Sequence, residues 1–235
     1  MKILIVCAHP DDETGCLGFL ARMSAERTRK GSGLPLHKIR MLFLGTGVGS
    51  RGEKGNDASR ATIERHIESG NALETIGITD RSWWGDGGPE DNCFDARPLL
   101  EITRKVEREV RRHRPDVIYT HQPNDLNIDH RIVCQAVLTA TRPVPGQTVK
   151  AVYGMEVPSS TEWAFGAPPF TPNVFQPLTD AQMEKKRAAL RCYASEMRSF
   201  PHPRSIEAID ALARWRGSQC GHPWAEAFQL LREVR

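Results

Sequence analysis

In the stretch Ile3-Leu4-Ile5-Val6-Cys7-Ala8-His9-Pro10-Asp11-Asp12-Glu13, an apolar run ends in one imidazole and three carboxylates. Six apolar residues that stop at a proline turn are typical of a buried central strand in a parallel sheet. In open α/β sheets, functional groups gather just beyond the carboxyl ends of the strands. We therefore expect the polar residues from His9 to Glu13 to lie at such an edge.

Strands and helices alternate along the rest of the chain. Further strands are expected over residues 39–44, 116–120 and 149–157, and helices over residues 14–30, 58–76, 95–113, 130–141, 180–197 and 205–214. This alternation predicts an α/β fold with a Rossmann-like, mostly parallel sheet, right-handed crossovers and helices on both faces. No repeat or clear boundary interrupts the chain, so we expect a single domain spanning residues 1–235.

Composition restricts the class of partner and the compartment. The chain has 32 Lys and Arg against 29 Asp and Glu, and a formal charge of +3 does not indicate a nucleic-acid partner. We expect a small-molecule substrate instead. The six cysteines include no C-x-x-C pair, which favours reduced thiols in the cytoplasm. No stretch approaches the roughly 18 apolar residues of a membrane span, so we expect a soluble cytoplasmic protein.

A second polar cluster, His-Gln-Pro-Asn-Asp-Leu-Asn-Ile-Asp-His-Arg over residues 121–131, lies between an expected strand and an expected helix. Parallel strands end at the same edge of a sheet, so both clusters can converge on one cleft. A catalytic zinc commonly takes three protein ligands and leaves a fourth position for water. His9, Asp12 and His130 could supply that set. Asp11 is then the natural base, since a carboxylate beside activated water can accept its proton.

Both clusters also allow simpler interpretations. Asp125-x-Asn127-x-Asp129 imitates the start of an EF-hand calcium loop, but His130 stands where that loop needs glycine. Ala136 likewise stands in the place of the final glutamate, which argues against calcium. The first cluster alone could be a solvated turn that places acidic groups at the positive end of a helix. The presence of the second cluster favours a metal site.

Three other segments each have a simple structural interpretation. The glycine-rich residues 45–52 lack a Walker lysine-serine pair, so they are either a plain turn or a close approach to substrate with Arg51 available for an anionic group. The basic residues 104–112 include glutamates at helical spacing, which predicts a solvated helix face. Residues 158–177 are rich in proline and aromatics, and predict a loop folded onto the core or a surface for sugar stacking. That loop could also cover a neighbouring copy, so a homo-oligomer is compatible with the sequence.

The two polar clusters resemble the motifs of the PIG-L/LmbE family of zinc-dependent N-acetylglucosamine deacetylases. Family members open with a strand that ends in A-H-P-D-D-E, and residues 8–13 match that motif in full. They also carry an x-D-H motif before a helix, which residues 129–130 match. The resemblance implies that zinc is held by His9, Asp12 and His130, with Asp11 as general base. It further implies that Asp129 orients nearby catalytic groups.

The resemblance leaves two site residues and the metal open to alternatives. Arg65 resembles an arginine that contacts substrate, for which a bidentate guanidinium is suited, and a salt bridge with Glu68 or Glu226 is the structural alternative. Many relatives have a histidine three residues before the metal-binding histidine, where this chain has Asn127. An amide can donate a hydrogen bond to an oxyanion but cannot supply a proton as imidazolium does. Fe²⁺ in place of Zn²⁺ is compatible with the same ligands.

These observations predict a hydrolase that removes the N-acetyl group from an N-acetylglucosamine-type amino-sugar conjugate and releases acetate. Because Asn127 cannot act as an acid, protonated Asp11 would return its proton to the leaving amine, with His121 and His222 as alternative acids. An amidase acting on another small amide is the alternative within the same chemistry. A non-catalytic protein that binds a metal or nucleotide is the alternative from a different class.

Overall fold

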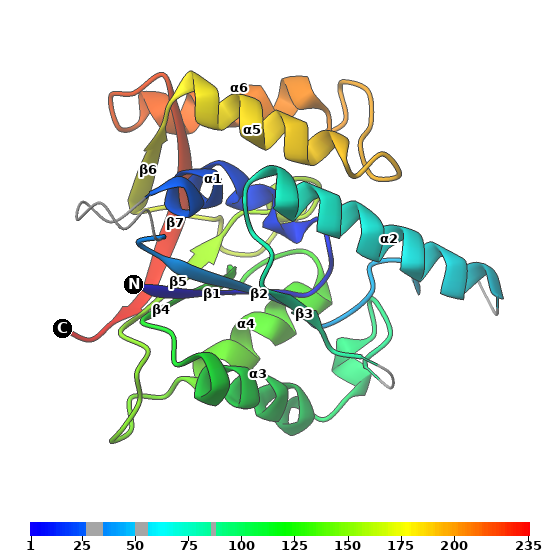
Figure 1. Cartoon of the computed structure of the whole chain (residues 1–235), viewed down its shortest axis with the longest axis vertical. Helices are drawn as coiled ribbons and strands as arrows, with labels where there is room; N and C mark the ends of the chain where they lie inside the picture. Colours follow the sequence, from blue (N-terminus) through cyan, green and yellow to red (C-terminus); the bar gives the residue numbers. More distant parts are fainter. Residues whose placement is uncertain (27–34, 50–55, 86–87) are drawn as a thin grey trace.

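The computed structural model describes the chain except for residues 27–34, 50–55 and 86–87, and its described strands form one sheet in the order β3-β2-β1-β4-β5-β7-β6 (Figure 1). The strands are β1 (Lys2–Cys7), β2 (Lys38–Phe43), β3 (Arg81–Trp83), β4 (Val117–His121), β5 (Ala151–Met155), β6 (Val174–Leu178) and β7 (Trp224–Glu233). The α-helices are α1 (Leu17–Ala25), α2 (Asn56–Thr75), α3 (Leu99–His113), α4 (Ile128–Ala140), α5 (Asp180–Arg191) and α6 (Ile206–Ser218). Short 3₁₀ turns are η1 (Asp12–Gly15), η3 (Phe94–Ala96) and η4 (Thr161–Trp163).

Strands β1 to β5 are parallel to one another, and at one edge β7 pairs antiparallel with both β5 and β6. The predicted α/β fold with a mostly parallel sheet is therefore confirmed. Helices cover both faces: α1, α2, α5 and α6 lie on one side of the sheet, and α3 and α4 on the other (Figure 1). No described helix is long and apolar enough to span a membrane.

Strand β1 is the centre of the core, as its unbroken apolar sequence predicts. Ile3, Ile5 and Cys7 pack in the cluster that contains Phe19 of α1 and Leu190 of α5. The residues between and after them, Leu4, Val6 and Ala8, pack in a second cluster with residues of α3 and α4. Successive side chains of a strand point to opposite faces, so a strand between two helical layers must be apolar at every position.

Several expected boundaries differ from the structure. The sequence predicts the first helix from Thr14, but a 3₁₀ turn precedes α1, and the expected end of that helix at residues 31–33 lies outside the described part of the chain. Helix α5 ends at Arg191 rather than near Met197, and α6 continues to Ser218. Strand β6 begins inside the segment expected to be a loop. Pro177 belongs to it, which a strand at the edge of a sheet tolerates.

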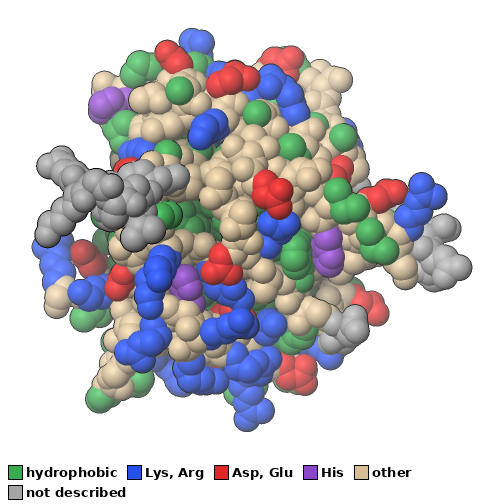
Figure 2. Space-filling model, viewed as in Figure 1, with side chains coloured by type: hydrophobic (Ala, Val, Ile, Leu, Met, Phe, Trp, Pro, Cys, Tyr) green, Lys and Arg blue, Asp and Glu red, His purple; other side chains and the backbone are tan. Residues whose placement is uncertain are grey.

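The basic helix face behaves as its charge pattern predicts. Ile102, Val106 and Val110 of α3 are buried, whereas Arg104 and Arg108 are exposed. In the space-filling view, Lys and Arg side chains gather on the lower part of the visible face, on the side of the molecule where α3 lies (Figure 2). The glutamates of the same helix partly neutralise this charge, as in the Arg111–Glu107 pair at 3.6 Å.

The topology brings the two polar clusters together. Strands β1 and β4 are neighbours, with Ile3 beside Val117 and Ile5 beside Tyr119. Both strands run in the same direction, so the residues that follow β1 and those that follow β4 meet at one edge of the sheet. A direct hydrogen bond joins the two ends, because the backbone N–H of Ala8 donates to His121 Nε2 over 2.8 Å.

Candidate metal centre

The turn after β1 presents adjacent carboxylates in different directions. Asp12 Oδ2 accepts the backbone N–H of His9 over 2.7 Å, which folds the turn back on itself. Asp11 adopts a φ of 100°, a left-handed conformation that is costly for a side chain with a Cβ and that clusters at functional sites. Glu13 Oε2 accepts the N–H of Asp11 over 3.0 Å and so holds this conformation.

Close contacts fix the chain that leaves the turn. A Cβ at Gly15 would clash with the carbonyl oxygen of Glu156, so no other residue fits there without a backbone shift. Buried Glu13 also accepts a hydrogen bond from the hydroxyl of Tyr193, in the segment after α5. Burial raises the pKa of Glu13 to about 8 against the opposing effect of the Tyr193 hydrogen bond, and the two contacts of Glu13 tie the turn to the segment after α5.

His9, Asp12 and His130 form the one metal-binding group found among the described residues. One nitrogen or oxygen atom from each lies within 4.8 Å of the others, and all three side chains are buried. His130 Nε2 lies 3.1 Å from Asp12 Oδ1, and His9 Nδ1 lies 3.6 Å from Asp12 Oδ2. Two imidazoles and a carboxylate are a common donor set for a divalent metal with an open coordination position.

The other nitrogen of each imidazole is held by a further carboxylate. Asp129 Oδ2 lies 2.9 Å from His9 Nε2, and Asp125 Oδ1 lies 3.0 Å from His130 Nδ1. Metal-ligating histidines nearly always donate their second N–H in this way, which orients the ring and fixes its tautomer. The residues present therefore fit a metal ion, with His9 offering Nδ1 and His130 offering Nε2.

The charge of the site also favours a cation. Burial alone would lower the pKa of His130, but the negative charges of Asp12 and Asp125 raise it to about 10. The pKa of His9 is likewise raised against its burial, chiefly by the hydrogen bond to Asp129 and the charge of Asp12. The same carboxylates that attract a proton to the two rings would attract a divalent ion to the point between them.

Asp125, which the sequence presents only as part of a rejected calcium motif, organises the second cluster. Its carboxylate accepts the backbone N–H of Asn127 over 3.0 Å and hydroxyl hydrogen bonds from Ser160 and Thr161, the latter at 2.6 Å. The fixed Asp125 then positions the ring of His130. A sequence signal existed, since Asp125 lies five positions before His130 in the same polar loop.

The helix that carries His130 begins with a cap supplied by Asn127. The Asn127 side-chain oxygen accepts the N–H of Asp129 over 2.9 Å. Asn127 is half-buried, and its side chain is held at the start of α4 by the helix that it caps. Asp129 is anchored in turn, because its carboxylate accepts the backbone N–H groups of Asn92 and Phe94, the latter at 3.0 Å.

Asp11 lies in an ion-pair network that the sequence did not reveal. Its Oδ2 accepts a hydrogen bond from Nη1 of Arg204 over 2.5 Å, and the same Nη1 lies 2.5 Å from Glu196 Oε2. Burial raises the pKa of Asp11 to about 6, and the charge of Arg204 opposes that rise. Arg204 thus keeps a buried carboxylate available as a proton acceptor.

Arg65 belongs to the same network. It forms ion pairs with Glu68, at 3.2 Å, and with Glu196, and its side chain is only 3% exposed. The expected alternative of a salt bridge with Glu68 is therefore present, whereas Glu226 pairs elsewhere, with Lys186 at 2.7 Å. Contact of Arg65 with a substrate stays a prediction.

The glycine-rich segment after β2 is tied to the site by Asp91, another residue that the sequence did not single out. The Asp91 carboxylate accepts the backbone N–H groups of Val48 over 2.6 Å and Gly49 over 2.7 Å. Its other oxygen lies 3.6 Å from His9 Nε2. The segment therefore packs beside the metal-binding group, whereas Arg51 lies outside the described residues.

Comparison with known protein families also points to the two polar clusters. Residues 4–141, which include both polar clusters, match the family model described as PIG-L, GlcNAc-PI de-N-acetylase. The chain belongs to the PIG-L family.

Among the relatives of this PIG-L family member is the uncharacterized deacetylase YaiS of Escherichia coli. It is 31% identical over 198 residues, which cover 82% of this chain and 90% of the relative. Two solved structures share the fold. An N,N'-diacetylchitobiose deacetylase from Pyrococcus horikoshii aligns with a TM-score of 0.72 at 16% identity, covering 98% of this chain and 84% of that one. A 4-carboxy-2-hydroxymuconate hydratase from Pseudomonas putida aligns with a TM-score of 0.73 at 20% identity, covering 100% and 97%.

Family membership identifies the chain as a deacetylase of the PIG-L/LmbE type. The structural likenesses below 25% identity show the fold alone, and the presence of a hydratase among them illustrates that this fold carries more than one chemistry. The residues of the site must therefore carry the functional argument.

Proposed function

We propose that the protein hydrolyses the N-acetyl group of an N-acetylglucosamine-type amino-sugar conjugate and releases acetate and a free amine. The observation that carries this proposal is the position of Asp11, a buried carboxylate that directly precedes Asp12 of the metal-binding group but is bound to Arg204 instead. A site built only to hold a metal has no need of this extra carboxylate and its own arginine.

His9, Asp12 and His130 would hold the metal. When bound, Zn²⁺ would lower the pKa of a water molecule toward about 7 and polarise the amide carbonyl, and Fe²⁺ is the alternative ion for this donor set. Asp129 and Asp125 keep the two imidazoles in the tautomers and orientations that ligation requires.

Asp11 acts as the general base and then as the acid. It accepts a proton from the attacking water and returns that proton to the leaving amine, so the departing group is neutral. Arg204 stabilises the charged form of Asp11 between turnovers. The Asn127 amide, held at the start of α4, donates a hydrogen bond to the oxyanion that forms as the carbonyl carbon becomes tetrahedral.

The two alternative acids fit this role less well. The His121 ring is fully buried, its Nε2 accepts the N–H of Ala8, and burial together with neighbouring His130 lowers its pKa to about 3. The ring therefore stays neutral and serves as a packing partner of His130, on which it stacks with centroids 3.9 Å apart. His222 is exposed, in the turn between α6 and β7. This leaves the proton return to Asp11.

The substrate class is supported by the family, which is that of the GlcNAc-PI de-N-acetylase, and by the likeness to the N,N'-diacetylchitobiose deacetylase, since both names refer to N-acetylated sugars. Arg51 and Arg65 are the proposed substrate contacts. The guanidinium of Arg65 already pairs with Glu68 and Glu196, so Arg65 would have to bind the substrate alongside these two carboxylates. An amidase acting on another small amide is the alternative, because the site fixes the carbonyl chemistry and not the group attached to nitrogen.

The test is release of free amine and acetate from a panel of N-acetylglucosamine conjugates, with non-sugar N-acetyl amides and other acyl groups in parallel. Protein of measured metal content is compared with a chelated sample. Chelator-sensitive release of acetate from the sugar conjugates supports the proposal. Turnover confined to the non-sugar amides would establish the amidase alternative, and no turnover by protein that carries about one metal per chain would contradict both.

A further inference from the structure

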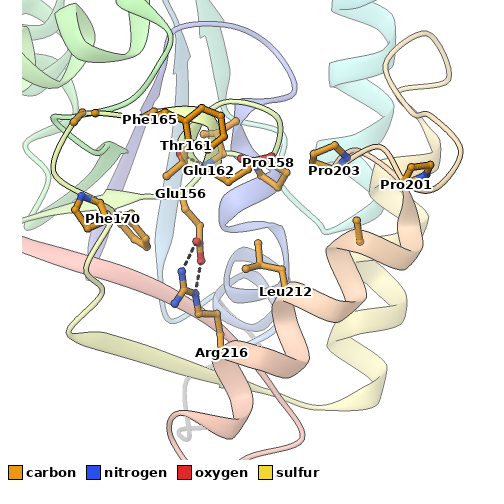
Figure 3. A pocket seen from close by; sticks show the side chains of 16 residues that line it. Glu156, Pro158, Thr161, Glu162, Phe165, Phe170, Pro201, Pro203, Leu212 and Arg216 are labelled. Atoms are coloured by element: carbon orange, nitrogen blue, oxygen red, sulfur yellow. Dashed lines mark hydrogen bonds and ion pairs between the residues drawn. The ribbon is translucent and has the colours of Figure 1, made fainter.

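A cavity lies next to the loop that supports the metal centre. It has a volume of about 580 Å³ and lies between α6, the loop around η4 and the turn before α6 (Figure 3). Aromatic and proline side chains form much of its wall: Phe165, Phe170, Pro158, Pro169, Pro201 and Pro203. This volume is in the range of pockets that bind small molecules.

The polar side chains of the cavity are already paired within the protein. Both oxygens of Glu156 accept hydrogen bonds from Arg216, at 2.8 and 2.6 Å, and Figure 3 marks this pair at the cavity wall. The Thr161 hydroxyl donates to Asp125 over 2.6 Å and accepts from the N–H of Val157 over 2.8 Å. These pairings leave the side chains with little capacity to bind a ligand.

Glu162, the remaining polar side chain of the wall, is occupied in the same way. Its two oxygens accept the backbone N–H groups of Ser159, at 2.6 Å, and of Ser160, at 3.3 Å. With all four polar side chains of the wall paired, the cavity offers few free groups to a ligand rich in hydroxyls. It is suited to an apolar ligand.

The aromatic part of the wall favours a ring in particular. The guanidinium carbon of Arg216 lies 5.6 Å from the centre of the Phe170 ring, which is within cation–π range. Phe165 is 86% exposed, an unusual position for a large apolar side chain beside a concave surface. A bound aromatic group would cover Phe165 and extend the contact between Phe170 and Arg216.

The cavity lies next to two segments that support the metal centre. Thr161 lines the cavity and donates to Asp125, the residue that orients His130. Pro203 also lines it, and the next residue, Arg204, binds Asp11. A group bound in the cavity would therefore lie beside the segments that fix the proposed catalytic carboxylate and one metal ligand.

We propose that this cavity binds the apolar aglycone, best an aromatic ring, of the amino-sugar conjugate whose N-acetyl group is placed at the metal centre. This inference rests on the proposed deacetylase function. It assigns the sugar and the aglycone to two neighbouring sites that the segments around Thr161 and Pro203 separate. It also gives the aromatic residues of the loop a role as an aglycone site rather than as a surface for sugar stacking.

The test compares four N-acetyl-β-glucosaminides. One carries a methyl aglycone, and the other three carry a phenyl ring that is attached directly, through a short alkyl linker or through a longer alkyl linker. Because the segments around Thr161 and Pro203 lie between the two sites, the ring needs a linker to reach the cavity from the sugar. In the wild type we expect kcat/KM to rise about tenfold over that of the methyl glycoside once the linker is long enough, through burial of the ring.

Two substitutions on α6 locate the effect. Ala208→Phe fills the cavity, and Ala211→Phe is the matched control, since Ala211 is exposed on the same helix and does not line the cavity. Ala208→Phe should remove the preference for the linked phenyl ring and leave the methyl glycoside unaffected. Ala211→Phe should behave as the wild type does.

Two further measurements keep the inference testable if Ala208→Phe does not fold or if no glycoside is hydrolysed. Phe165→Ala removes an exposed side chain, so it should fold normally and lose part of the phenyl preference. Binding of the phenylalkyl β-glucoside with the longer linker, which has no amide, is followed by saturation-transfer NMR. Phe165→Ala and Ala208→Phe should both weaken that binding.

The outcomes separate this inference from the proposed function. Metal-dependent hydrolysis of all the glycosides with equal kcat/KM would overturn the aglycone site and leave the deacetylase function standing. Binding of the phenylalkyl β-glucoside without hydrolysis of any conjugate would contradict the deacetylase function while supporting the cavity as a site for the ring. If the phenylalkyl β-glucoside accelerates hydrolysis of the methyl glycoside rather than competing with it, the cavity is an effector site and the aglycone assignment is overturned.

Discussion

Arg204 Nη1 lies 2.5 Å from Asp11 Oδ2, although the two residues are 193 positions apart in the sequence. The same nitrogen lies 2.5 Å from Glu196 Oε2, and Arg204 Nε donates to the Ser159 hydroxyl over 2.6 Å. Asp11 is therefore held by a guanidinium that is itself fixed by other partners. A carboxylate that must accept a proton in one geometry benefits from such a partner.

Removal of this partner should lower turnover more than substrate affinity. We predict that Arg204→Ala reduces kcat about 100-fold with little change in KM, because a displaced base costs rate rather than binding. Arg204→Lys should recover part of the loss by restoring the charge without the planar fork. Steady-state kinetics with Arg198→Ala, at an exposed arginine of the same loop, provide the control. A matching fall in both variants would show that the effect is not specific to the Asp11 contact.

Asp125 should be required for metal affinity although it is not a ligand. Asp125→Ala frees the Nδ1 side of His130 and removes the acceptor of the Ser160 and Thr161 hydroxyls. Loss of such a supporting carboxylate typically costs about 10- to 100-fold in metal affinity. Competition with a chromogenic chelator measures the change, and Asp95→Asn, at an exposed acidic position, is the control. Unchanged affinity would mean that the contact between Asp125 and His130 does not orient a metal ligand.

Glu226 should stabilise the fold rather than take part in catalysis. Its carboxylate accepts the N–H groups of Gly18 and Phe19, at 2.9 and 2.6 Å, at the start of α1, and it pairs with buried Lys186. Glu226→Ala leaves that ammonium buried without its partner, so we predict a loss of about 3–5 kcal/mol in the free energy of unfolding. Urea denaturation measures it. A loss well below about 1 kcal/mol would show that water replaces the carboxylate at little cost.

The cysteines should differ sharply in reactivity. Burial raises the pKa of the Cys7 and Cys16 thiols well above the ordinary value and that of Cys134 to about 12, whereas Cys93 is exposed. The thiolate is the reactive form, so a disulfide reagent at about pH 8 should modify Cys93 rapidly and the three buried thiols only on unfolding. Mass spectrometry of the native protein over time assigns the sites. Early modification of Cys7 would contradict the burial of β1.

The strand that ends before His9 could be predicted from the sequence, since six apolar residues before a polar turn admit few other interpretations. The convergence of the two polar clusters followed from the parallel sheet. The strands β3, β6 and β7 could not be predicted in the same way. The residues of β3 and most of those of β6 are partly exposed, and β6 contains Pro177. The pairing of β7 with β5 and β6 depends on contacts far apart along the chain.

The supporting residues of the site were harder to predict than its proposed ligands. Asp91 lies in an irregular segment, where the sequence does not indicate which acidic side chains turn inward, whereas Asp125 could have been found from its place in the polar loop before His130. Arg204 lies in the turn before α6 and reaches Asp11 only because the chain folds back across the carboxyl edge of the sheet. Such pairings depend on loop conformation, and no local pattern of residues encodes them.

In the proposed mechanism, Asp11 performs chemistry beside a metal that other residues hold. Asp11→Asn is the sharpest variant, because asparagine tolerates the positive φ at this position and keeps the shape of aspartate but cannot accept the proton. Metal content and acetate release are measured on the same preparation. We predict metal content equal to that of the wild type, with turnover reduced by at least about 100-fold. Loss of metal in proportion to activity would identify Asp11 as a ligand instead of the base, and turnover close to that of the wild type would show that Asp11 does not accept the proton.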